Sequence, residues 1–201
     1  MILPNQLTVL RIILTPVFLV LFLSDDPVLV QISLGVFLIA AITDWYDGWL
    51  ARKFNYITEW GKFLDPLADK ILTSTAFVAF VVLGILELWM VLLIIIRDLI
   101  VTGLRLIADH RKISFSTSRS AKWKTFLQMF FLYYILLLYT AGTVEWINVW
   151  NRELIELLLN PTLIYYSMLF ITIFTVFTGI TYILSNRFLI KQLFNIETKS
   201  D

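Results

Sequence analysis

Long, nearly uninterrupted apolar runs constrain the fold of this chain more than any other feature of its sequence. About twenty apolar residues cross a lipid bilayer as a helix, and the alternative for a single chain is a closed β-barrel, whose strands alternate in polarity. Six continuous runs are present, near residues 7–23, 28–50, 66–86, 88–106, 124–142 and 161–185. We therefore predict an all-α integral membrane protein with six transmembrane helices.

The composition supports this fold class. Of the 201 residues, 59% are hydrophobic and 15% are charged, whereas about a quarter of the residues of a soluble domain are charged. The spans leave no room for a second folded domain, so residues 1–201 are predicted to form a single membrane domain. The chain has no cysteine and one histidine, which excludes thiolate chemistry and a histidine-rich metal cluster.

The distribution of basic residues predicts the orientation. If residue 1 faces the cytoplasm, all of the 16 lysines and arginines except Arg152 fall on the cytoplasmic side, as the positive-inside rule requires. Both termini and the polar site are then cytoplasmic. No organelle-targeting segment is evident, so a bacterial cytoplasmic membrane is the expected location, and no nucleic-acid partner is expected.

Two segments between the spans are predicted not to cross the bilayer. Residues 53–64 mix lysine and glutamate with aromatic residues, which is typical of a short segment at the membrane interface. Residues 143–160 on the outer side favour an amphipathic helix, and an ordinary loop with tryptophan anchors remains the alternative.

Four aspartates lie in the stretch "DWYDGWLARKFNYITEWGKFLDPLADK", at the inner ends of two apolar runs. They are Asp44, Asp47, Asp65 and Asp69. On a helix, positions 44, 47, 48, 51 and 52 share one face, and positions 61, 65 and 69 share another. Pro66 fits either the first turn of a helix or a kink in a helix that began earlier.

Acids in a membrane span are costly and indicate function. Four converging carboxylates repel one another, and the nearby Arg52 and Lys70 are too few to balance them, so we expect two divalent cations, Mg²⁺ or Mn²⁺. Such ions take oxygen ligands and complete their shell with water and substrate phosphates. Gly48 and Ala51 leave room for a large polar ligand, and Arg52 suits a phosphate. The alternative is a helix-packing seam lined by small residues.

The pattern Asp44-x2-Asp47-Gly48-x2-Ala51-Arg52-x8-Gly61-x3-Asp65-x3-Asp69 resembles the signature of the CDP-alcohol phosphatidyltransferases at every defining position. The resemblance implies a six-helix membrane enzyme, usually a homodimer, that transfers a phosphatidyl group from CDP-diacylglycerol to an alcohol and releases CMP. It also implies roles for individual residues. The four aspartates would hold two metal ions, Asp69 would be the general base, and the CDP moiety would contact Gly48, Arg52 and Thr58.

Two further patterns resemble the members of that family that use glycerol-3-phosphate as the acceptor. Pro4-Asn5-x2-Thr8-x2-Arg11 implies that Asn5 and Thr8 lie near the nucleotide phosphates, although Asn5 also suits a helix N-cap. Arg97-Asp98-x6-Arg105 and the segment from Ser120 to Met129 imply that Arg97, Arg105 and Lys124 bind the acceptor. A doubly charged acceptor needs such cations opposite four acids. Position 98 departs from the family pattern, because aspartate stands where glutamate is expected, and the shorter acid would weaken a pairing.

Other functions remain open at this point. Cardiolipin synthases and enzymes that use inositol phosphate or serine share the metal motif. Intramembrane prenyltransferases also use paired aspartate motifs with Mg²⁺, but they are longer and lack the Asp-Gly-x2-Ala-Arg element. A cation channel would need ionisable groups in the outer halves of its spans, where this sequence has none.

Overall fold

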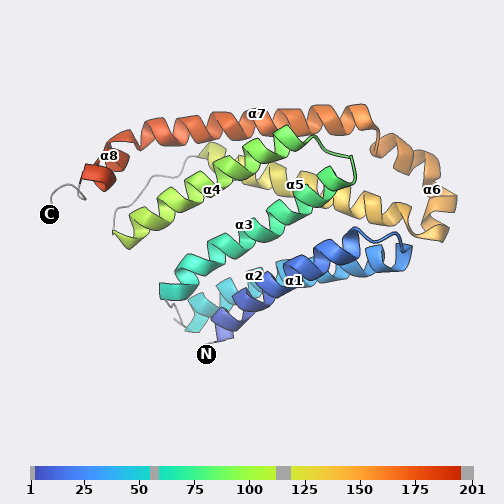
Figure 1. The fold of residues 1–201 in the computed structure, drawn as a ribbon, viewed down its shortest axis with the longest axis horizontal. Coiled ribbons are helices and arrows are strands. Elements are labelled where there is room, and N and C mark those ends of the chain that lie inside the picture. The colour runs from blue at the N-terminus through green and yellow to red at the C-terminus, as the bar shows by residue number, and fades with distance from the viewer. Residues whose placement is uncertain (1–2, 55–58, 112–118, 196–201) are drawn as a thin grey trace.

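The computed structural model describes residues 3–54, 59–111 and 119–195, and all regular secondary structure in these residues is helical. The helices are α1 (Leu3–Phe22), α2 (Pro27–Phe54), α3 (Glu59–Val82), α4 (Leu88–His110), α5 (Arg119–Gly142), α6 (Glu145–Leu158), α7 (Pro161–Ser185) and α8 (Arg187–Asn195). The long helices run up and down in an elongated bundle (Figure 1), so that the last turns of α2, α4 and α7 lie at the same end as the first turns of α1, α3 and α5.

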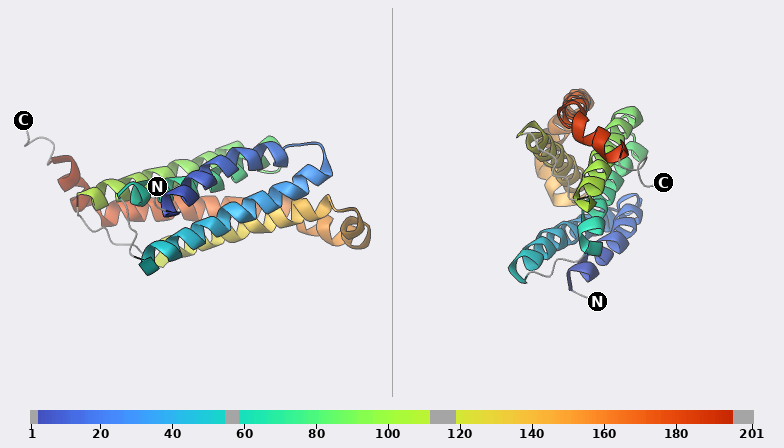
Figure 2. Two further views of the ribbon diagram at one scale, coloured as in Figure 1. Left: turned by 90° about the horizontal axis from the view of Figure 1, so that it is seen from below. Right: turned by 90° about the vertical axis from the view of Figure 1, so that its left-hand side faces the viewer.

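The long helices form two groups (Figure 2, right). In the first group α1 packs against both α2 and α3, and in the second α7 packs against both α4 and α5. Contacts of α3 with α4 and of α2 with α5 join the two groups. The short α6 links α5 to α7 at one end of the bundle, and α8 follows α7 at the other.

Local sequence signals determine several helix boundaries. The Asp26 carboxylate accepts a hydrogen bond of 2.8 Å from the Val28 amide, and Pro27 begins α2. Asn160 caps α7 in the same way, at 2.9 Å from the Thr162 amide, and is followed by Pro161. Both pairs follow the preference for an Asx cap and a proline in the first turn. Between α3 and α4 the chain turns at Gly84, whose φ of 71° favours glycine.

An aromatic cluster joins the groups in the half of the bundle away from the aspartates. Phe18 of α1 lies 5.1 Å from Phe37 of α2, whose ring is 5.7 Å from Tyr133 of α5. Phe22 of α1 lies 5.2 Å from Phe80 of α3. These rings pack in tilted or edge-on geometry, which is the favourable arrangement for aromatic pairs, and they fix α5 against the first group.

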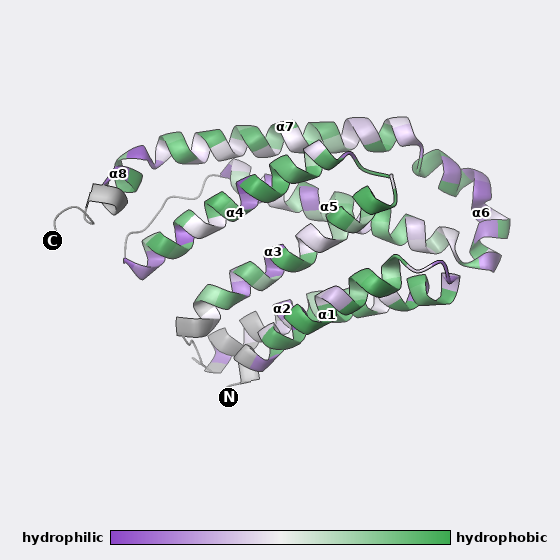
Figure 3. Cartoon of the chain, in the orientation of Figure 1, coloured by the Kyte–Doolittle hydropathy of each residue, from purple (hydrophilic) through white to green (hydrophobic). Residues whose placement is uncertain are grey.

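Among the described residues, three helices contain segments long and apolar enough to cross a membrane: Pro27–Asp44 in α2, Arg119–Gly142 and Pro161–Ser185. The apolar part of α1, Gln6–Phe22, is shorter. Hydrophobic residues dominate the middle of the long helices, and hydrophilic residues gather on α6 and at the end of α4 (Figure 3). The prediction of an all-helical protein with membrane-spanning helices is confirmed in this coarser form.

Several helices extend beyond the predicted membrane spans. The spans were drawn where apolarity stops, but α1 begins at Leu3 rather than near 7, α2 continues to Phe54, α4 to His110, and α5 begins at Arg119. Helical hydrogen bonding continues into the polar residues of the site, so hydropathy underestimates these helices. The helix α3 covers Glu59–Val82, so it begins before the predicted span 66–86 and ends before residue 86. The turn that follows α3 is also apolar, with Leu86 buried, so hydropathy alone cannot distinguish it from the end of a span.

The segments between the spans gave mixed outcomes. Of the interface segment predicted at 53–64, residues 53–54 belong to α2 and residues 59–64 belong to α3. Its place at the membrane interface stays a prediction. Residues 55–58 lie outside the described residues. The amphipathic helix predicted within residues 143–160 is confirmed as α6, which is interrupted by a non-helical residue at Asn151. Its place on the outer side stays a prediction. The helix α8 was not predicted.

Candidate functional site

Asp44, Asp65 and Asp69 of the motif lie near one another at the end of the bundle where α2 ends and α3 begins. One face of α1 holds two of them. Arg11 Nη1 lies 2.6 Å from Asp44 Oδ1 on α2, and the Thr8 hydroxyl donates a hydrogen bond of 2.5 Å to Asp65 Oδ1 on α3. Thr8 and Arg11 are three residues apart on α1 and both are buried. The helix α1 therefore brings the aspartates of α2 and α3 together, although they are far apart in sequence.

The third described acid, Asp69, lies one helical turn after Asp65 on α3. Asp65 and Asp69 both act electrostatically on Asp44. Within its own helix, Asp69 Oδ2 lies 3.0 Å from the ammonium nitrogen of Lys70. Three carboxylates therefore lie near one another, with Arg11 paired to Asp44 and Lys70 paired to Asp69. Such a gathering of negative side chains is expected at a site that binds cations.

The remaining residues of the motif are only partly described. Asp47, Gly48 and Arg52 lie on α2, which is continuous to Phe54 and so keeps them on the same helical face as Asp44, but their side chains lie outside the described residues. Thr58 lies outside them entirely. Pro66 lies inside α3, which begins at Glu59, so of the two readings the helix that began earlier is correct.

The two amino-terminal positions have different outcomes. Asn5 lies inside α1, which already begins at Leu3, so the alternative of an N-cap is wrong; its side chain lies outside the described residues. Thr8 uses its hydroxyl proton on Asp65. A direct contact of Thr8 with a nucleotide phosphate would need that proton, so the observed hydrogen bond favours a role for Thr8 in orienting Asp65.

The donor chemistry of Asp44, Asp65 and Asp69 fits a divalent cation such as Mg²⁺ or Mn²⁺, because carboxylate oxygens are the ligands that hard cations prefer. Among the described side chains, which leave out that of Asp47, no three acidic groups form a complete metal site. A complete site of the predicted kind would therefore need Asp47 as well.

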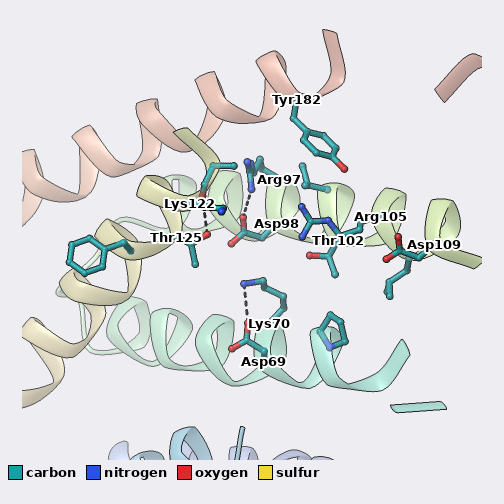
Figure 4. Close-up of a pocket in the computed structure, with 15 residues that line it drawn as sticks. Asp69, Lys70, Arg97, Asp98, Thr102, Arg105, Asp109, Lys122, Thr125 and Tyr182 are labelled. Carbon is teal, nitrogen blue, oxygen red and sulfur yellow. Dashed lines mark hydrogen bonds and ion pairs between the residues drawn. The ribbon is translucent and has the colours of Figure 1, made fainter. Parts of the chain in front are cut away.

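A pocket of about 610 Å³ lies beside Asp69, between α3, α4, α5 and α7 (Figure 4). Its polar wall combines acids with a larger number of basic groups. The charged residues that line it are Asp69, Lys70, Arg97, Asp98, Arg105, Asp109 and Lys122. Because Asp69 lies on this wall and also in the acidic cluster, the pocket opens directly onto the aspartates. A ligand in the pocket would meet cations on α4 and a carboxylate on α3.

Arg97 is held by its neighbour on α4 and by α7. Its Nη1 lies 3.1 Å from Asp98 Oδ1, and its Nη2 donates a hydrogen bond of 3.1 Å to the Thr178 hydroxyl of α7. The ammonium group of Lys124, on α5, pairs with the same Asp98 oxygen. Asp98 thus joins α4 to α5 despite being shorter than the expected glutamate.

The three residues predicted to bind the acceptor have different surroundings. Arg97 and Arg105 line the pocket. Arg105 is exposed, and its charge acts on the Tyr182 hydroxyl of α7. Lys124 is buried behind Asp98 and does not line the pocket. In this arrangement Lys124 supports the pocket wall, whereas the two arginines can reach a ligand.

The sequence analysis did not identify the contribution of α7. Thr175, Thr178, Gly179 and Tyr182 follow the i, i+3, i+4, i+7 spacing of one helical face and are all buried. A stripe of small and polar residues on an otherwise apolar span is the signal that could have identified this face, because such residues mediate close helix contacts in membranes.

Comparisons with known proteins agree with this geometry. Residues 1–186 match the family described as CDP-alcohol phosphatidyltransferase. A CDP-diacylglycerol–glycerol-3-phosphate 3-phosphatidyltransferase of Rickettsia typhi is 40% identical over 135 residues, which cover 67% of this chain and 76% of the relative. A protein of the same name from Bacillus subtilis is 40% identical over 139 residues, covering 63% and 72%. A probable phosphatidylglycerophosphate synthase of Mycobacterium tuberculosis is 40% identical over 129 residues, covering 63% and 61%.

Proposed function

The chain belongs to the CDP-alcohol phosphatidyltransferase family, and we propose that it transfers the phosphatidyl group of CDP-diacylglycerol to glycerol-3-phosphate. The products are phosphatidylglycerophosphate and CMP. The observation that carries this proposal is the position of Asp69, which lies both in the acidic cluster and on the wall of a pocket rich in basic groups. Relatives that are 40% identical carry the name of this activity.

The reaction is a displacement at phosphorus. A hydroxyl oxygen of the acceptor attacks the phosphorus atom that carries the diacylglycerol, and the bond from that phosphorus to the CMP oxygen breaks. Asp69 takes the hydroxyl proton as general base, because its carboxylate borders both the pocket and the acidic cluster. A positioned base of this kind contributes roughly 10²–10⁴-fold to a rate. Lys70, whose ammonium nitrogen lies 3.0 Å from Asp69 Oδ2, holds that carboxylate in place.

The aspartates Asp44, Asp47, Asp65 and Asp69 would hold two divalent cations, Mg²⁺ or Mn²⁺. When bound, such ions neutralise the diphosphate and the charge that develops on the departing phosphate oxygen. Arg11 and Thr8 contribute by orienting Asp44 and Asp65 before any ligand arrives. By the family pattern the nucleotide contacts Asn5, Gly48, Arg52 and Thr58, and the absence of a side chain at Gly48 leaves space for it.

The basic groups of the pocket select an anionic acceptor. Glycerol-3-phosphate carries about two negative charges, and Arg97 and Arg105 can form charge-assisted hydrogen bonds with its phosphate. Lys70 and Lys122 add positive charge to the same wall. A neutral alcohol or a zwitterion such as serine offers these cations no phosphate to bind, which disfavours its binding.

The helices α1–α5 and α7 cross the membrane in this proposal, and the acidic cluster lies on the cytoplasmic side of a bacterial cell membrane. The up-and-down arrangement brings the aspartates and the pocket arginines to the same end of the bundle. At that end water-soluble CMP and glycerol-3-phosphate reach the site while the acyl chains stay in lipid. The active form is a homodimer.

A panel of acceptors tests the proposal. The purified protein in detergent or vesicles is given CDP-diacylglycerol and Mg²⁺ with glycerol-3-phosphate, serine, inositol phosphate or phosphatidylglycerol, and CMP release is followed. We expect turnover with glycerol-3-phosphate, loss of turnover with EDTA, and recovery with Mg²⁺ or Mn²⁺. Turnover of serine, inositol phosphate or phosphatidylglycerol without turnover of glycerol-3-phosphate would contradict the assigned acceptor.

A further inference from the structure

The glycine at position 179, on the face of α7 that meets α4, lies against the side chain of Arg97. A Cβ atom placed on Gly179 would lie 2.8 Å from Arg97 Cγ and 3.3 Å from its Nε. Carbon atoms that are not bonded prefer separations near 3.5–4.0 Å, so the first contact is a collision. It involves the base of the Arg97 side chain, so rotating the guanidinium end alone cannot relieve it.

The other end of Arg97 is also constrained. Nη1 is bound to Asp98 and Nη2 to Thr178, the residue next to Gly179. Nε is buried and makes no hydrogen bond within the described residues, and it lies on the side facing Gly179. The orientation of the guanidinium therefore depends on two hydrogen bonds and on the space that the missing side chain of Gly179 provides.

Among the glycines with described surroundings, Gly179 is the one at which an added Cβ would collide with another residue. A Cβ on Gly35, Gly84 or Gly103 would meet nothing within 4 Å, and one on Gly142 would lie at an ordinary 3.8 Å from Ile155. Its φ does not require glycine either, since the positive φ in the described chain belongs to Gly84. A glycine in mid-helix is costly, and close approach of Arg97 supplies a reason for this one.

We propose that Gly179 is a positioning residue of the acceptor site, which sets the direction of Arg97 by leaving room for its aliphatic stem. This inference rests on the proposed function, because it assigns Arg97 to the acceptor phosphate. A side chain at position 179 displaces Arg97 from Asp98 and Thr178, so the pocket loses a fixed cation. Acceptor binding should weaken, while the binding of CDP-diacylglycerol beside α2 should not change.

The variant Gly179→Ala tests the proposal, with Gly103→Ala as the matched control on α4. Steady-state kinetics of CMP release give the KM for each substrate. We expect Gly179→Ala to raise the KM for glycerol-3-phosphate about tenfold, the effect of losing one charge-assisted hydrogen bond. The KM for CDP-diacylglycerol should stay within twofold of the wild-type value, and Gly103→Ala should change neither constant.

A double-mutant cycle separates positioning from a general effect on α7. In an Arg97→Ala background no stem remains to collide, so adding Gly179→Ala should change the acceptor KM by less than twofold. An unchanged KM in the single variant, or an equal increase with and without Arg97, would overturn the proposal. If Gly179→Ala alone fails to fold, the double variant should recover folding, and failure to recover would also overturn it. A wild-type protein that ignores glycerol-3-phosphate would instead refute the proposed function.

Discussion

The two helix groups both bury charge in an apolar bundle, but they stabilise it differently. In the first group, α1–α3, the acids remain open, with 44% of the Asp44 side chain and 33% of the Asp69 side chain exposed. In the second group, α4, α5 and α7, Asp98 and Lys124 pair with only 6% and 1% of their side chains exposed. The partly exposed acids of the first group leave room for a cation to bind. The buried ion pair of the second group already has its counter-charge and supports the helices around it.

This difference assigns catalysis to the first group and structural support to the second. Replacing Asp69 in the first group should lower the rate with little loss of stability, because it removes repulsion as well as function. Replacing a buried partner in the second group leaves a buried charge without its nearest counter-ion, which is destabilising.

Asp69→Asn should remove the catalytic function of the first group. The amide cannot take the acceptor proton and is a poor ligand for Mg²⁺, so kcat for CMP release should fall by about 10³-fold or more. Thermal stability in detergent should be equal or higher. Asp25→Asn, in the turn at the opposite end of the bundle, is the control and should leave both unchanged. Activity within tenfold of the wild type would remove Asp69 from its assigned role.

Lys124→Met should destabilise the second group. The change leaves Asp98 with Arg97 as its remaining cation, and breaking a buried pair in this way costs about 3 kcal/mol. Unfolding in mixed SDS micelles measures the loss. Lys122→Met is the matched control on the exposed side of α5 and should have no effect on stability. Adding Asp98→Asn to Lys124→Met should restore part of the stability, and a further loss would refute the buried pairing.

Much of the first group could be predicted from the sequence because its signals are local. The aspartates repeat at helical spacing within 26 residues, and like charges at that density require a counter-ion. The apolar runs likewise predicted helices, although not where they end. The apolar runs stop where the polar residues of the site begin, whereas the helices α2 and α4 continue through those polar residues.

The second group could be predicted only in part, because its contacts join distant residues. The motif residues Arg97 and Lys124 were identified as acceptor ligands, yet Lys124 is buried behind Asp98. The bond from Arg97 to Thr178 joins positions 81 apart, and nothing in the local sequence of α4 predicts it. The stripe on α7 that contains Thr178 and Gly179 was the available signal, but a stripe does not reveal which helix packs against it.

Arg105→Ala tests whether an exposed arginine of the second group binds the acceptor without supporting the fold. Arg105 is exposed, whereas Arg97 is bonded to Asp98 and Thr178. The substitution should raise the KM for glycerol-3-phosphate about tenfold through the loss of one charge-assisted hydrogen bond. Stability should not change, in contrast to Lys124→Met. Arg105→Lys should show a smaller increase, since it keeps the charge and loses the planar fork. An effect confined to the KM for CDP-diacylglycerol would place Arg105 at the lipid substrate instead.

Thr8→Val tests whether the first group is tuned by α1 as well as by its own acids. Valine keeps the shape of threonine but cannot donate to Asp65, so the carboxylate loses an orienting bond worth about 1 kcal/mol. The affinity for Mn²⁺, followed by electron paramagnetic resonance, should fall about fivefold, with a matching rise in the Mg²⁺ concentration needed for half-maximal activity. Thr15→Val is the matched control, because Thr15 is also buried on α1 and its hydroxyl donates to the backbone carbonyl of Arg11. If both variants weakened Mn²⁺ equally, the effect would come from general packing of α1, and the specific link between Thr8 and Asp65 would be wrong.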